Sequence, residues 1–190
     1  MPESKEIEVL QCFAEKGPLT GYDLHSSDKA IISNAGWEKI RKRMIDQELI
    51  REVPFEDSDV RAHREKKYYW LTAHGVLVAT ALGQNPRLLK KMASEIKNYK
   101  FSSFESLLLD FFIILGDNKI SDIYMSMVLE MKEKGTGAIP FVIPTMLASL
   151  NNAKERQAFS EALRLHPELF DEAKNVFETI SKGFGNLFKG

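Results

Sequence analysis

Cysteine is almost absent from this chain, which has Cys12 alone among its 190 residues. A single thiol excludes an internal disulfide and a zinc site built from cysteines, and it suits a reducing compartment. Cys12 lies beside the apolar face of an expected first helix. We therefore interpret it as a buried, inert thiol rather than a redox sensor.

Long apolar segments are absent as well. The most apolar run, Leu107 to Leu115, is interrupted by Asp110 and is shorter than the roughly 20 residues that a membrane-spanning helix needs. The first residues, Met1 to Ile7, form no apolar signal region. Apolar residues make up 44% of the chain and charged residues 28%, which is typical of a soluble protein with one or two domains. We expect a cytoplasmic protein that does not enter a membrane.

The patterns that build catalytic sites are also missing. The four histidines fall in separate predicted elements, and none has the Glu-x-x-His or His-x-x-x-His spacing of a metal site. They are His25, His63, His74 and His166. The turn Gly135 to Gly137 lacks the Lys and Ser or Thr that complete a phosphate-binding loop. We expect no catalytic residue, no metal and no cofactor, and therefore no enzyme.

Charge of one sign is not in excess. The net charge of the whole chain is −1, and residues 1–82 hold 12 Lys or Arg against 14 Asp or Glu. The protein as a whole therefore does not attract nucleic acid. DNA binding would have to come from cations gathered on one surface.

The first 82 residues contain an ordered series of predicted helices and strands. Helices are expected at residues 5–15, at 21–25, from Ser33 or Asn34 to the first strand, and at 72–82, with strands at 50–53 and 67–71. Thr20 is expected to cap the second helix and Thr72 the fourth, because a threonine hydroxyl accepts a backbone N–H of the first turn.

The third helix carries the most informative signal. Trp37, Ile40 and Met44 fall on one face at offsets of three and seven residues and are expected to face the core. That orientation exposes four charged residues, Glu38, Lys39, Lys42 and Arg43. A basic helix face alone is more often solvated surface than a binding site. Here a strand, a charged loop and a second strand follow the helix directly, and that order favours binding.

Three segments in this region resemble the PadR/MarR-like winged-helix transcriptional regulators. Gly17 to Leu24 (GPLTGYDL) is similar to the family segment GPLxGYE(I/L), Arg43 to Ile50 (RMIDQELI) to RLxxxGLI, and Lys66 to Gly75 (KKYYWLTAHG) to RKYYxLTxxG. The chain departs from the pattern at Glu48, where a glycine usually ends the reading helix, and at Arg41, where the family residue is usually apolar.

The resemblance implies a mainly α protein with a winged helix-turn-helix domain at residues 1–82, whose wing has two strands, followed by an all-α domain at residues 83–190. It implies a sequence-specific regulator of transcription that binds double-stranded DNA as a dimer, with repression favoured over activation. The alternative is a winged-helix module that binds another protein and not DNA. The near-neutral charge and the acidic half of the wing, Glu56, Asp57 and Asp59, support that alternative.

Candidate DNA-binding residues follow from the way in which a helix enters the major groove. The N-terminal residues of a reading helix meet base edges, and its later residues lie near phosphates. The base-reading candidates are Asn34, Glu38 and Lys39, and the phosphate-binding candidates are Lys42 and Arg43. Ser33, which with Asn34 is a candidate cap of the helix, is a further DNA-binding candidate. The wing candidates for the minor groove are Arg61, His63 and Arg64.

The second half of the chain is expected to be helical after a boundary at Gly83 to Pro86. Apolar stripes mark helices at Phe104–Leu115, Ile120–Met131 and Leu169–Ile180, with one or two more between Thr145 and Leu165. Such stripes ordinarily form a self-contained helical core. Phe104–Leu115, however, has more apolar surface than one neighbouring helix covers, which indicates either a homodimer or a cleft for a small-molecule effector. We favour a homodimer through the C-terminal helices, because no convergent polar groups mark a pocket.

Overall fold

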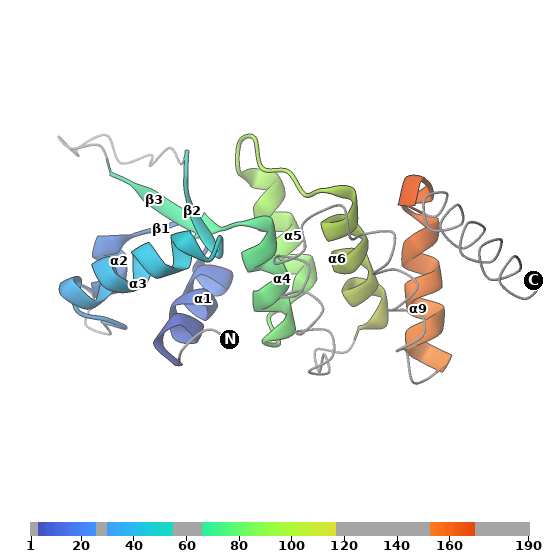
Figure 1. Cartoon of the computed structure of the whole chain (residues 1–190), viewed down its shortest axis with the longest axis horizontal. Helices are drawn as coiled ribbons and strands as arrows, with labels where there is room; N and C mark the ends of the chain where they lie inside the picture. The colour runs from blue at the N-terminus through green and yellow to red at the C-terminus, as the bar shows by residue number, and fades with distance from the viewer. Residues whose placement is uncertain (1–3, 26–29, 55–65, 117–152, 170–190) are drawn as a thin grey trace, which may run out of the picture. The chain divides into compact units, whose positions relative to one another are not determined.

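The structure is a computed structural model that describes residues 4–25, 30–54, 66–116 and 153–169 (Figure 1). In these ranges the chain is mainly helical and contains a small antiparallel sheet of three strands, so the expected mainly-α class is confirmed. The chain divides into two compact units, Met1–Lys100 and Phe101–Gly190.

Three helices open the first unit: α1 (Ser4–Lys16), α2 (Gly21–His25) and α3 (Asn34–Asp46). Gly17, whose φ is 85°, ends α1 with a bond from its N–H to the Phe13 carbonyl at 3.0 Å. Thr20 caps α2 as expected, because its Oγ1 accepts the N–H of Asp23 while the Asp23 carboxylate accepts the N–H of Thr20. Local sequence thus fixes where these helices begin and end.

The sheet has the strand order β1-β3-β2, with β1 at Leu19–Thr20, β2 at Ile50–Val53 and β3 at Tyr68–Leu71. The last two strands were predicted from the sequence and are confirmed. The two predicted strands pair with each other, and β1, which the sequence did not predict, adds a third strand to the sheet through antiparallel pairing of Leu19 with Tyr69. Two residues are too few to show a strand periodicity in the sequence.

Strand β3 lies in the centre of the sheet and of the core. All four of its residues are buried, and the indole of Trp70 donates a hydrogen bond to the Phe13 carbonyl at 2.9 Å. Helix α4 (Ala73–Ala81) follows at once, with Thr72 as its cap as predicted. A β-carbon at Gly75 would overlap the Leu49 carbonyl, so the first turn of α4 packs directly on the backbone that precedes β2.

Helix α5 (Pro86–Glu95) also belongs to the first unit, which moves the division of the chain from residue 82 to Lys100. The reason lies in the segment after α5. The Tyr99 hydroxyl donates to the Leu71 carbonyl at 3.1 Å, and its ring lies 5.4 Å from that of Trp70. Arg51 of β2 lies 4.9 Å above the same ring. These contacts hold the connection onto the sheet.

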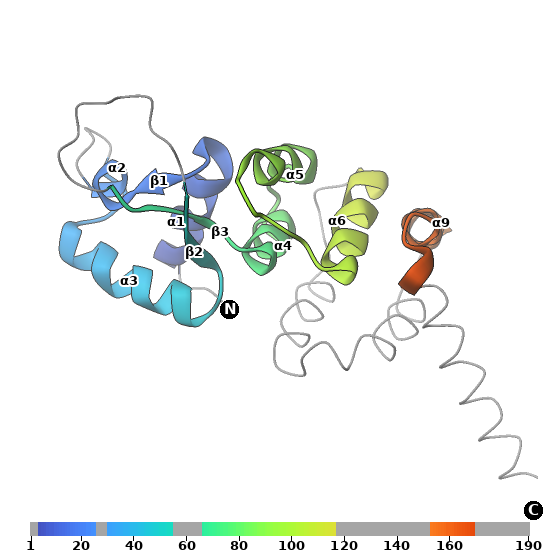
Figure 2. The same cartoon turned by 90° about the horizontal axis from the view of Figure 1, so that it is seen from above.

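In the second unit, α6 (Ser103–Leu115) and α9 (Ala153–Arg164) lie side by side (Figures 1 and 2). Ser102 and Glu105 form a capping box at the start of α6, and Phe111 meets Phe159 edge-on at 5.5 Å. His166 Nε2 lies 3.2 Å from the carboxylate of Asp110. The expected helix at Ile120–Met131 and nearly all of Leu169–Ile180 fall outside the described residues.

The apolar residues of α6 bear on the expected homodimer. Seven of them are buried within a single chain: Phe104, Leu107, Leu108, Leu109, Phe111, Phe112 and Leu115. A second copy is therefore not needed to cover α6. Among the residues that the structure describes, no helix is both long and apolar enough to cross a lipid bilayer.

Candidate nucleic-acid interface

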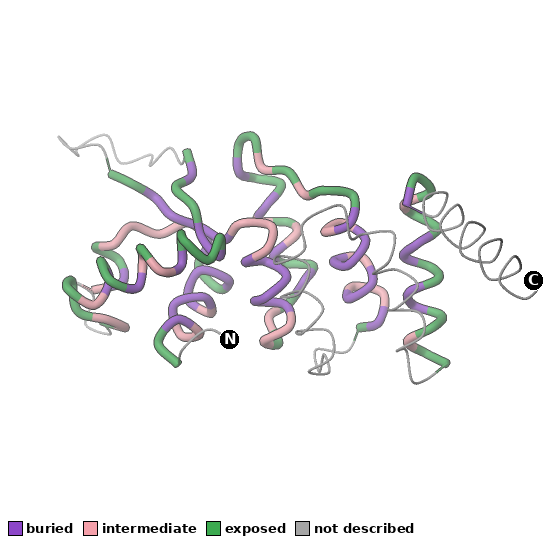
Figure 3. Tube along the Cα trace, in the orientation of Figure 1, coloured by how far each residue is buried: buried purple, intermediate pink, exposed green. Residues whose placement is uncertain are grey.

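Helix α3 has one buried and one exposed face, as Figure 3 shows along its length. Trp37, Ile40 and Met44 are 2%, 6% and 0% exposed, so their predicted inward orientation is confirmed. The exposed residues are Asn34, Ala35, Glu38, Lys39, Lys42, Ile45 and Asp46. Of these, Ala35, Lys39 and Lys42 follow one another at spacings of four and three residues and form a single row. We call them the outer row of α3.

Ser33 and Asn34 have different positions at the start of α3. Ser33 is the N-cap, and its hydroxyl accepts the N–H of Gly36 at 3.2 Å. Asn34 is the first residue of the helix, is exposed, and borders a hollow beside α3. Ser33 therefore orients the start of the helix, whereas the amide of Asn34 faces outward.

The expected exposure of Arg43 was wrong. Its Nε lies 3.0 Å from Oε1 of Glu6 on α1, and the Glu6 side chain is only 2% exposed. Arg43 is itself half-buried, because it lies on the flank of α3 that packs toward α1. This guanidinium joins two helices of the fold, so we no longer assign it to a phosphate.

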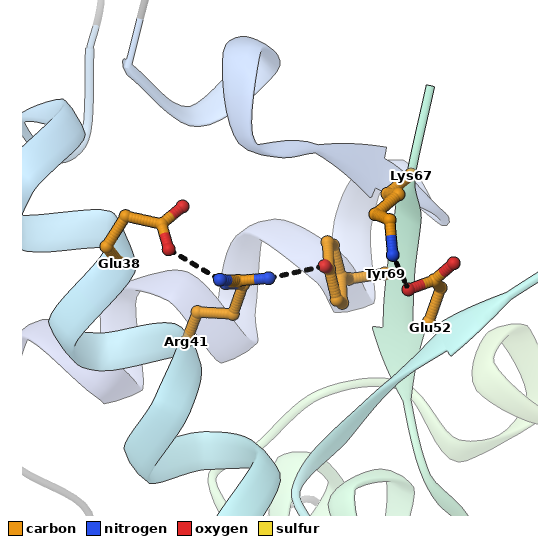
Figure 4. Close-up of polar contacts among 5 residues, drawn as sticks. All are labelled: Glu38, Arg41, Glu52, Lys67 and Tyr69. Atoms are coloured by element: carbon orange, nitrogen blue, oxygen red, sulfur yellow. Dashed lines mark hydrogen bonds and ion pairs between the residues drawn. The ribbon is translucent and has the colours of Figure 1, made fainter. Parts of the chain in front are cut away.

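Arg41 connects α3 to the sheet and to Glu38 (Figure 4). Its Nη1 donates to the Tyr69 hydroxyl at 2.7 Å, and its Nη2 donates to Oε2 of Glu38 at 2.5 Å. The guanidinium also lies 5.5 Å from the centre of the Tyr69 ring. Burial disfavours the charged guanidinium, but the hydrogen bonds to Tyr69 and Glu38 outweigh burial and raise the pKa of Arg41 above its ordinary value.

A hollow of about 620 Å³ lies beside this group, between α2, α3 and β3. Its lining includes Tyr22 and His25 of α2, Asn34 of α3, and Lys66 and Lys67, which immediately precede β3. Tyr22 is 70% exposed. The hollow therefore places both lysines on the surface next to α3 that also carries Asn34.

Lys67 pairs with Glu52 of the neighbouring strand, Nζ to Oε2 3.1 Å (Figure 4). The hydrogen bond to Glu52 raises the pKa of Lys67, and both side chains are more than half exposed. Pairs of this kind contribute little to stability in water. Lys67 can therefore leave Glu52 for another anion at small cost.

Several predicted site residues fall outside the described residues: Arg61, His63 and Arg64, with the acidic Glu56, Asp57 and Asp59. The sequence reasoning also missed residues that the structure brings to this surface. Ala35 belongs to the outer row, Lys66 and Lys67 line the hollow, and Tyr69 binds Arg41. The departure from an apolar residue at Arg41 was the signal that could have pointed to a polar partner in the sheet.

Comparison of the chain with protein-family models, curated proteins and solved structures finds no match. Within the described ranges, no three His, Cys, Asp or Glu side chains gather where a metal ion could be held.

Proposed function

We propose that this protein binds double-stranded DNA in a sequence-specific manner, with α3 as the reading helix of a winged helix-turn-helix domain. The outer row of α3 is the observation that carries the proposal. Lys39 and Lys42 are exposed on a helix whose opposite face is fixed in the core, and neither makes an ion pair within the described ranges. Two cations on a rigid helix suit a partner with regularly spaced negative charge.

The arrangement of the neighbouring elements supports the same proposal. The major groove of B-DNA admits one α-helix, and a loop between two strands beside that helix reaches the adjacent backbone or minor groove. Strand β3 lies next to α3, and Lys66 and Lys67, which immediately precede β3, border the hollow. These lysines are suited to a phosphate next to the groove that α3 enters.

The weak overall charge makes two copies more effective than one. We propose a homodimer that uses the second unit, because two reading helices about one DNA turn apart match a palindromic site. About six phosphate contacts in such a dimer would give a log–log salt slope of about −5. Repression by occlusion of a promoter is the mode that we favour.

Replacement of both outer-row lysines tests the proposal. The variant Lys39→Ala/Lys42→Ala should lower the affinity for a selected duplex roughly tenfold or more at low salt and should flatten its salt slope. The matched control, Lys97→Ala/Lys100→Ala, removes the same charge from exposed positions after α5 and should bind like the wild type. Equal affinity of all three proteins in a fluorescence anisotropy titration would contradict the role of α3.

A second candidate function is the binding of another protein at the same surface. Two large side chains favour it, because Tyr22 is 70% exposed beside the hollow and Ile45 of α3 is 41% exposed. Aromatic and aliphatic side chains of this kind anchor protein interfaces. If this reading is correct, no duplex binds and a Tyr22→Ala/Ile45→Ser variant loses the protein partner, whereas Lys39→Ala/Lys42→Ala retains it.

A further inference from the structure

Glu38 is an acidic residue on the surface that we propose to face DNA, and its position calls for an explanation. Its side chain is 57% exposed and lies one turn after Asn34 and one turn before Lys42. A carboxylate at this place repels phosphates unless it serves another purpose. We propose that Glu38 selects a cytosine in the major groove, held in position by Arg41 and Tyr69; this inference rests on the proposed DNA binding.

Arg41 and Tyr69 hold one carboxylate oxygen of Glu38. Arg41 donates to Oε2 of Glu38 at 2.5 Å, and it is itself anchored by the Tyr69 hydroxyl at 2.7 Å. Figure 4 shows the second carboxylate oxygen of Glu38 pointing away from Arg41, and within the described residues it has no partner. Arg41 thus holds Oε2 of Glu38, and the other carboxylate oxygen is available to a donor on a DNA base.

The anchor is rigid. Tyr69 is 4% exposed, and its ring meets Trp37 of α3 edge-on at 5.7 Å. The guanidinium of Arg41 rests against the Tyr69 ring while it binds the hydroxyl. The hydrogen bond from Arg41 therefore restricts the rotamers of Glu38, so that less conformational entropy is lost when a base binds.

The hydrogen-bonding capacity of a carboxylate determines which base it can select. An ionised carboxylate only accepts hydrogen bonds. In the major groove, guanine presents two acceptors and thymine presents an acceptor and a methyl group, whereas cytosine presents the N4 amino donor. Adenine also has an amino donor, but its N7 acceptor lies next to it and repels a carboxylate. Cytosine is therefore the base that Glu38 favours.

The same chemistry predicts the effect of a single atom change. Glutamine has nearly the shape of glutamate, and its amide oxygen can keep the hydrogen bond from Arg41, so that its amide nitrogen, which only donates, replaces the oxygen that faces the base. Glu38→Gln should therefore change the preferred base at one position of each half-site from cytosine to guanine, which presents two acceptors. Glu38→Ala should remove the preference at that position and leave the other positions unchanged.

Tyr69→Phe separates positioning from direct contact. It keeps the ring that packs on Trp37 and removes only the hydroxyl that anchors Arg41. We expect an overall affinity within about threefold of the wild type, because the phosphate contacts are retained. The preference for cytosine should fall from about tenfold toward twofold, because Glu38 is no longer held in one orientation. A merely structural role of Tyr69 would lower affinity for every sequence equally.

Selection from a pool of random duplexes, followed by sequencing, tests the inference with wild type, Glu38→Gln, Glu38→Ala and Tyr69→Phe. A cytosine that becomes guanine only in Glu38→Gln supports it. An unchanged motif in Glu38→Gln, or an unchanged cytosine preference in Tyr69→Phe, overturns the base contact or the positioning role respectively. If the wild type enriches no sequence, the proposed function itself fails, and this inference fails with it.

Discussion

Glu6 of α1 and Arg43 of α3 form an ion pair with an Oε1 to Nε distance of 3.0 Å, and the carboxylate is almost fully buried. A buried charge that loses its counter-ion is costly, whereas replacing both partners with apolar residues is often neutral. The pair therefore fixes the orientation of α3 against α1. It also explains why this arginine of a basic helix is half-buried.

Removal of the guanidinium should destabilise the first unit. We expect Arg43→Ala to lower the free energy of unfolding by about 3 kcal/mol, because Glu6 loses its cation in a buried site. Both tryptophans of the chain, Trp37 and Trp70, lie in this unit, so tryptophan fluorescence during urea denaturation reports its unfolding. The double variant Glu6→Leu/Arg43→Met should regain most of the loss. A double variant as unstable as the sum of its single changes would show that the two residues are not coupled.

Replacement of Glu48 should stabilise the protein, in contrast to Arg43→Ala. It ends α3 with a φ of 54°, the left-handed conformation that glycine adopts without strain. The N–H of Leu49 donates to the Met44 carbonyl and closes the turn that contains Glu48, so the end of the helix requires this conformation. Glu48→Gly should stabilise the first unit by about 1 kcal/mol. Glu48→Ala is the matched control, since it keeps the β-carbon, and a gain as large as that of glycine would refute the strain argument.

Gly75 should tolerate no side chain. A β-carbon there overlaps the Leu49 carbonyl, which also accepts the N–H of Thr72 at 3.0 Å. We expect Gly75→Ala to cost about 3 kcal/mol in the same denaturation experiment, because backbone on both sides must move. Ala73→Ser changes a half-buried position in the same turn and should cost less than 1 kcal/mol. Equal losses in the two variants would contradict the close approach.

Cys12 gives a prediction on pH. Burial raises the pKa of its thiol above the ordinary value of 9.0, so the folded protein keeps its proton at a pH where the unfolded chain has lost it. Because the pKa of Cys12 is higher in the folded protein than in the unfolded chain, the buried neutral thiol contributes fully to stability below about pH 9. That contribution is lost as the pH rises toward the pKa of Cys12 in the folded protein. The stability difference between wild type and Cys12→Ala should therefore shrink above pH 9. A difference that stays constant with pH would contradict a buried neutral thiol.

Local sequence predicted much of the fold. Gly17, Thr20 and Thr72 mark helix ends through their own backbone or hydroxyl groups, and the structure places them there. The inward face of α3 followed from the spacing of its apolar residues. Such features depend on neighbours within one or two turns, which the sequence displays directly.

The remaining features depend on partners far apart in the chain. Nothing near Arg43 in sequence indicates Glu6, and nothing near Tyr99 indicates its contacts with Trp70 and Leu71. The same holds in the candidate site, because Arg41 of α3 donates a hydrogen bond to Tyr69, which lies far along the chain in β3. The exposed lysines of α3 could be identified from the sequence, but the hydrogen bonds that connect Glu38 to Arg41 and Tyr69 could be identified only from the structure.

The salt dependence of duplex binding tests the central claim most directly. The wild-type protein should be titrated against a selected duplex by fluorescence anisotropy at several salt concentrations, and log affinity plotted against log salt. We predict a straight line with a slope of about −5, which corresponds to about six phosphate contacts in a dimer. A flat line, or no binding at the lowest salt, would contradict DNA recognition by α3.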